Sequence, residues 1–210
     1  VIAGRRVLRV AEVTVELGHE LAGVGSGYFD GRHAGGGGGS ACGACKACRA
    51  GSSHSRAAGV ALSPITGGPS VNESLETNIP GVFAAGNVLH VHDLVDYVSE
   101  EAGAAGEHAA AYILKSEHAA GRTLPVRCEN GVRYTVPTAI RPDCAGDTVT
   151  LRFRVGGVYK NKKIAVYRGT DCIYSRKRPV LAPGEMETVR LKAELLRGPG
   201  DAVTVTLEEG

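Results

Sequence analysis

Two histidines in this sequence have a spacing that suits metal or cofactor chemistry. His90 and His92 are two residues apart, so in an extended segment both imidazoles point to the same side. Asp93 is the nearest further ligand in the sequence, and two histidines by themselves leave a zinc site incomplete. Three interpretations stay open: polar residues of a loop, which the sequence favours, side chains beside a bound cofactor, and metal ligands.

A cysteine run is the second feature with possible chemistry. Cys42, Cys45 and Cys48 have the C-x2-C-x2-C spacing that begins a ferredoxin iron–sulfur motif, but the sequence has no Cys-Pro ending after them. A zinc site that recruits His54, or a redox dithiol of the first two cysteines, also fits the spacing. Each of these sites needs an ordered scaffold, which the neighbouring glycines 35–39 do not favour.

The third feature is a glycine followed by an amide at the end of an apolar run. Residues 82–85 are expected to form a short strand that stops at Gly86 and Asn87, with a helix to follow. The glycine lets a ligand approach the backbone, and the Asn87 amide can bond a sugar hydroxyl. The positive end of the helix dipole favours a negative group. A plain strand–turn–helix connection has the same pattern.

Hydrophobic spacing predicts a helix directly after these residues. Residues 94–115 carry apolar side chains at intervals of three and four, and Asp93 lies at the start, where the helix dipole favours an acid. Gly103 and Gly106 each cost about 1 kcal/mol relative to alanine inside a helix. We therefore expect something to approach the helix backbone closely at these two positions.

From residue 124 onward the apolar period changes to two, which indicates strands. In residues 148–155 apolar side chains alternate with polar ones, which predicts a buried face and a face in water that carries Arg152 and Arg154. Short strands separated by turn signals are typical of a small antiparallel β-sandwich. Six strands are predicted, at residues 134–138, 148–155, 163–167, 171–175, 187–192 and 202–208.

The overall composition narrows the class of protein. Of the 210 residues, 43% are hydrophobic and 22% are charged, which is typical of a globular protein. Lys and Arg total 24 against 22 for Asp and Glu, so the net charge of +2 gives no basis for nonspecific nucleic-acid binding. No apolar run approaches the roughly 18 residues of a membrane span, and residues 1–10 do not resemble a signal peptide. We expect a cytoplasmic protein whose six cysteines are thiols or ligands.

Residues 77–87 resemble a known cofactor-binding motif. They read Thr-Asn-Ile-Pro-Gly-Val-Phe-Ala-Ala-Gly-Asn, and ten of the eleven positions fit the second FAD-binding motif of pyridine nucleotide–disulfide oxidoreductase-like flavoproteins, T-x-x-P-G-[VI]-[FY]-A-x-G-D. The exception is Asn87, where the family has an aspartate. Residues 88–101 look like a subgroup of NAD(P)/FAD-dependent oxidoreductases associated with anaerobic glycerol-3-phosphate oxidation. Members of that subgroup also carry a C-terminal extension similar to residues 125–210.

This resemblance implies an α+β protein and an activity. Residues 56–120 would be the C-terminal fragment of an FAD-binding α/β domain, and residues 125–210 a small antiparallel β-sandwich. The whole enzyme would move hydride or electrons between a reduced substrate or NAD(P)H and FAD. The residues implied beside the cofactor are Gly81, Ala85, Gly86, Asn87, Leu94 and Val95, with His90 and His92 as candidate catalytic residues.

The same resemblance implies that another polypeptide segment supplies the part of the FAD-binding domain that holds the ADP half. The G-x-G-x-x-G fingerprint that holds the ADP half of FAD is absent from the sequence. We therefore expect the chain by itself to bind FAD weakly, and to need the N-terminal half of the oxidoreductase or partner subunits of a redox complex. Two other functions stay open: a non-catalytic β-sandwich interaction module with a flavoprotein remnant, and a metal or iron–sulfur protein that uses the three clustered cysteines.

Residues 1–55 form a separate, glycine-rich region that we expect to be poorly ordered. Residues 18–60 are dominated by glycine, alanine and small polar residues, and the only larger apolar side chains between Gly18 and Ser40 are Leu21, Val24, Tyr28 and Phe29. The flavoprotein subgroup has an apolar strand just before the segment that matches residues 56–60, and the codons of residues 48–54 permit a similar strand when read two bases later. Three hypotheses stay open: a frameshifted segment, a flexible linker and a genuine cysteine site.

Overall fold

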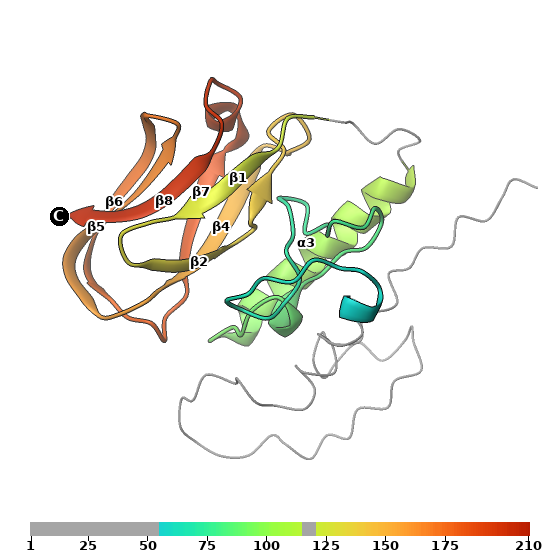
Figure 1. The fold of residues 1–210 in the computed structure, drawn as a ribbon, viewed down its shortest axis with the longest axis horizontal. Coiled ribbons are helices and arrows are strands. Elements are labelled where there is room, and N and C mark those ends of the chain that lie inside the picture. Colours follow the sequence, from blue (N-terminus) through green and yellow to red (C-terminus); the bar gives the residue numbers. More distant parts are fainter. Residues whose placement is uncertain (1–54, 115–120) are drawn as a thin grey trace, which may run out of the picture.

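The computed structural model describes residues 55–114 and 121–210. In these ranges the chain has the expected α+β class, with a long helix beside two β-sheets (Figure 1). None of the described helices is both long and apolar enough to cross a membrane. The described elements are, in chain order, η1 (Gly86–Val88), α3 (Val95–Leu114), β1 (Leu124–Cys128), β2 (Val132–Val136), β3 (Ala139–Ile140), β4 (Thr148–Val155), β5 (Tyr159–Arg168), β6 (Asp171–Leu181), β7 (Glu187–Lys192), η2 (Ala193–Leu196) and β8 (Val203–Glu209).

The strands of residues 121–210 form two sheets that pack face to face. The strand orders are β3-β1-β8-β5-β6 and β2-β4-β7. Both sheets contribute to one core, in which Leu151 and Phe153 of β4 meet Ile164 of β5 and Val205 of β8. The expected purely antiparallel arrangement is wrong for one pair, because β1 and β8 run parallel. A parallel pair needs a long crossover, and all of β2 to β7 supplies it.

The period-two pattern located most of these strands. The predicted strands 148–155 and 187–192 coincide with β4 and β7. β6 continues six residues beyond its predicted end at residue 175. This strand is paired with β5 at the end of its sheet and is largely exposed on both faces, so its sequence shows little alternation there. Two short strands, β1 and β3, were not predicted.

The outer face of β4 is covered by the helix rather than by water. Arg152 was predicted on the wet face, but it is 6% exposed. Its guanidinium nitrogens lie 2.8 Å from Glu100 Oε2 and 3.4 Å from Glu101 Oε1, both on α3. The prediction fails because the helix that covers this face is distant in sequence, so the strand's own alternation carries no sign of it.

The residues before α3 form turns rather than the predicted strand at residues 82–85. A single bridge joins Phe83 to Glu76, and the backbone has positive φ at Leu75, Gly81 and Gly86. The apolar run is instead buried in a second core, whose members are Val71, Leu75, Phe83, Ala84, Ala85, Val88, Leu89, Ala105, Ala109, Tyr134 and Val136. Residues 82–85 are therefore held mainly by packing against α3 rather than by pairing in a sheet.

Candidate functional site

The two histidines converge on a glutamate of α3. His92 Nε2 lies 3.1 Å from Glu101 Oε2, and His90 Nε2 lies 3.5 Å from Glu101 Oε1. The two imidazole rings have centroids 4.5 Å apart. One ligand atom from each of the three residues lies within 4.8 Å of the others. We call His90, His92 and Glu101 the His–His–Glu cluster.

Helix periodicity places the glutamate in this cluster. Glu101 precedes the buried Ala105 and Ala109 by four and eight residues, so the three side chains share one face of α3. Asp93, the nearest further ligand in the sequence, is not part of the cluster: it accepts the Met186 N–H and lies 3.6 Å from Arg154. The signal that could have identified Glu101 is a carboxylate on the apolar stripe of a helix.

The Glu101 carboxylate is held by backbone and side-chain groups besides the histidines. Its Oε2 accepts the Gly86 N–H at 2.6 Å, and its Oε1 accepts Arg152 Nη1 at 3.4 Å. The Arg152 guanidinium also lies 5.7 Å from the centre of the Tyr97 ring. These contacts connect η1, α3 and β4 through one buried carboxylate.

The electrostatics of the cluster favour an ionised glutamate beside a neutral imidazole. Burial raises the pKa of the Glu101 carboxyl, but the contacts with His90 and His92 outweigh burial and bring that pKa down to about 2. Burial also lowers the pKa of His90, against the attraction of Glu101, which raises it. A neutral His90 next to an ionised Glu101 is therefore the state at neutral pH.

Several nitrogens of the cluster are buried without a partner among the described residues. They are both ring nitrogens of His90 and Nδ1 of His92. His90 Nε2 therefore lies 3.5 Å from Glu101 Oε1 without a directed hydrogen bond between the two atoms. A buried polar atom left unpaired costs about 1–3 kcal/mol, and native proteins satisfy such atoms with water, an ion or a ligand.

The glycines of the FAD-like motif lie against α3. Gly81 has φ +78° and donates its N–H to Glu76, and a Cβ added there would lie 3.1 Å from the Tyr112 ring. Ala85 is fully buried and Gly86 is buried with φ +74°. Because Glu101 already accepts the Gly86 N–H, this amide is not free to bind a ligand.

The other residues that the resemblance implies beside the cofactor lie at the surface. Asn87 is exposed, and its Oδ1 accepts the backbone N–H of His92 at 3.1 Å. Leu94 and Val95 are 53% and 75% exposed, and Val91 is also exposed. We call Val91, Leu94 and Val95 the helix-start patch, since they lie at or just before the first turn of α3.

The described chain therefore offers two candidate sites, the His–His–Glu cluster and the helix-start patch with Asn87. The alternative ligands Cys42, Cys45 and Cys48 lie outside the described residues. Comparisons of the chain with protein-family models, with curated proteins and with solved structures found no match.

Proposed function

We propose that this chain is the C-terminal portion of an FAD-dependent oxidoreductase that transfers hydride or electrons between a reduced substrate or NAD(P)H and FAD. The observation that carries the proposal is the run of residues 77–87, of which ten of eleven positions fit the second FAD-binding motif. In the proposed enzyme the remaining part of the FAD domain comes from an N-terminal half or from partner subunits of a redox complex.

The surroundings of the motif support this proposal. Gly86 has a positive φ, which glycine adopts without strain, and this turn leads the chain to the exposed Asn87. The side chains of Leu94 and Val95 offer an apolar surface for a flavin ring at the first turn of α3. The positive end of the helix dipole at that turn favours the anionic reduced flavin.

The proposal assigns one end of the cofactor to this chain. Asn87 can bond a ribityl hydroxyl and the helix-start patch can contact the ring system, whereas the fingerprint for the ADP half is absent from the sequence. The described contacts thus favour FMN and FAD equally, because the two share the flavin and the ribityl chain. ADP, which lacks both, has no assigned contact.

A titration followed by NMR tests this assignment. Isotope-labelled full-length chain is titrated with FMN, FAD and ADP to millimolar concentration, and the amide shifts are mapped. We expect FMN and FAD to shift the amides of Asn87, Leu94 and Val95 with similar weak affinity, and ADP to shift none of them. Shifts from ADP equal to those from FAD, or no shift at these residues with saturating FMN, would contradict the proposal.

Two matched valine variants test whether FMN binds at the helix-start patch or at any exposed apolar side chain. Val95 is 75% exposed and Val158, on the sandwich, is 66% exposed. Val95→Ser is expected to weaken FMN binding about fivefold, equivalent to about 1 kcal/mol of lost apolar contact. Val158→Ser is expected to leave FMN binding unchanged. Equal effects of the two substitutions would place the flavin elsewhere.

A further inference from the structure

The donor set of the His–His–Glu cluster suits a transition metal. It joins two imidazoles, borderline ligands that suit Zn²⁺, Cu²⁺, Fe²⁺ and Ni²⁺, to one carboxylate. Two histidines and a glutamate are also the protein ligands of a known type of zinc site, in which a fourth position is left for water or substrate. Mg²⁺ and Ca²⁺ prefer all-oxygen ligands, so this set discriminates against them.

Two of the separations between ligand atoms are close to those of a coordination shell. Tetrahedral zinc with bonds of about 2.0–2.1 Å sets neighbouring ligand atoms roughly 3.4 Å apart. The nitrogen–oxygen separations here are 3.1 Å for His92 and 3.5 Å for His90, each to one oxygen of Glu101. The set already lies within 4.8 Å overall, so small side-chain rotations bring it around one ion.

The cluster is buried, and three of its ring nitrogens have no hydrogen-bond partner among the described residues. The side chains of His90, His92 and Glu101 are each about 1% exposed. His90 Nε2 has no hydrogen-bond partner within the part of the chain that the structure describes. An ion bound to it satisfies an atom that is otherwise buried at a cost.

The groups around the cluster support a bound cation. The Gly86 N–H and the Arg152 guanidinium hold the Glu101 carboxylate in place, as outer contacts orient a metal ligand. Arg152 itself is positive, but Glu100 lies 2.8 Å from it and offsets its charge. Glu100 and Glu101 thus face the buried Arg152 guanidinium, and Glu100 also pairs with the exposed Arg190 at 2.9 Å.

We propose that His90, His92 and Glu101 bind one divalent transition-metal ion, for which Zn²⁺ is the natural probe. On binding, the hydrogen bond between His92 and Glu101 is replaced by coordinate bonds from both side chains to the ion. Each coordinating Nε2 is then unprotonated, and the imidazole carries its proton on Nδ1. The site does not depend on flavin binding, so it stands or falls separately from the proposed function.

Metal titration of the full-length chain tests the proposal. The protein carries Cys42→Ser, Cys45→Ser and Cys48→Ser so that the cysteine run does not compete, and bound metal is first removed with a chelator. We expect calorimetry to show one Zn²⁺ per chain with micromolar or tighter affinity, and Mg²⁺ to show none. We expect Co²⁺ to give visible absorption of a nitrogen and oxygen site without a thiolate charge-transfer band.

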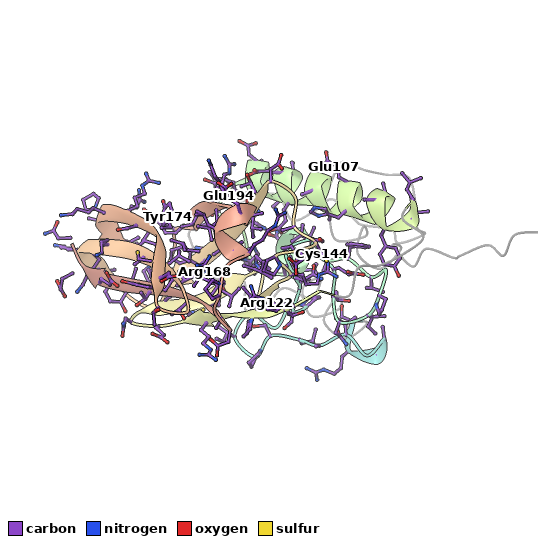
Figure 2. The ribbon with its side chains drawn as sticks, turned by 90° about the horizontal axis from the view of Figure 1, so that it is seen from above. Glu107, Arg122, Cys144, Arg168, Tyr174 and Glu194 are labelled. Carbon is purple, nitrogen blue, oxygen red and sulfur yellow. The ribbon has the colours of Figure 1, made fainter. Side chains whose placement is uncertain are left out.

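Matched variants locate the ion. His92→Ala and Glu101→Gln are expected to weaken Zn²⁺ binding by at least about 100-fold, more than the loss of an outer contact would. His108→Ala and Glu107→Gln change the same residue types elsewhere on α3 and are expected to have no effect; Figure 2 shows Glu107 on the outer side of this helix.

Circular dichroism of each variant separates loss of the site from loss of the fold. If Glu101→Gln unfolds the chain, His92→Ala decides the question together with the Co²⁺ spectrum of the parent protein. Zn²⁺ binding that is absent from the parent protein, or that is unchanged in a folded His92→Ala variant, would overturn the proposal.

Discussion

Arg152 projects from β4 into the space between the three-stranded sheet and α3, where its guanidinium meets two carboxylates. Its side chain is 7% exposed, and its Nε is buried without a hydrogen-bond partner among the described residues. Removing a charge from water costs several kcal/mol, which good ionic partners offset. The arginine and Glu101 therefore depend on each other.

Replacement of Arg152 tests this dependence. Arg152→Leu leaves the Glu101 carboxylate buried without its cationic partner, so we expect the free energy of unfolding to fall by about 3–5 kcal/mol. Arg190 also pairs with Glu100, at 2.9 Å, but its side chain is 64% exposed. Arg190→Leu is expected to cost less than about 1 kcal/mol. Urea unfolding curves measure the free energy of unfolding of both variants. Equal decreases would contradict the conclusion that Glu101 depends on the buried Arg152.

At the same scale, the sequence predicted part of the His–His–Glu cluster. The two-residue spacing of His90 and His92 predicts side chains on the same side, and their ring centroids lie 4.5 Å apart. Glu101 was missed because its approach depends on how residues 86–94 fold back over α3. That fold is set by buried contacts such as the Gly86 N–H bond to Glu101, which spans fifteen residues and leaves no periodic signal.

Among the elements, those whose own sequence pattern marks the buried face were predicted best. α3 agrees with its predicted range within one residue at each end, and Ala105 and Ala109 of its apolar stripe face the core. β4 and β7 were predicted with their bounds, since each has one face in the sandwich core. The strand predicted at residues 82–85 is wrong because its apolar residues pack on a helix, and an apolar run by itself does not reveal which kind of element will cover it.

Glycine substitutions test the element-level account. An alanine Cβ at Gly103 or Gly106 of α3 would meet no described atom within 4 Å, so we expect each Gly→Ala change to raise the free energy of unfolding by about 0.5–1 kcal/mol. At Gly68 the same Cβ would collide with the backbone carbonyls of Val88 and Leu89, and Gly68→Ala is expected to be strongly destabilising. Thermal unfolding measures all three. A loss of stability at Gly103 or Gly106 would support the earlier expectation that something packs against this backbone.

For the molecule as a whole, β2 connects the two cores. Val132 belongs to the sandwich core, whereas Tyr134 and Val136 belong to the core around α3. Ion pairs cross the same boundary: Arg141, just after β3, lies 3.0 Å from Glu73 and 3.2 Å from Glu76. The boundary that the resemblance implies between residues 120 and 125 thus separates two parts of the chain that share buried contacts.

Hydrogen exchange can show whether these contacts make one cooperative unit. If residues 55–114 and 121–210 unfold together, the slow amides of α3 and β4 should lose protection at the same urea concentration. Arg141→Met removes ion pairs that cross the boundary, and we expect it to make α3 open at lower urea than β4. Lys163→Met removes an ion pair with Glu208 inside one sheet and should leave the two transitions coincident. Separate transitions in the unmodified chain would instead mean that α3 unfolds independently of the sandwich. The His–His–Glu cluster relies on Arg152 from β4, so it would then be assembled in only a fraction of the molecules.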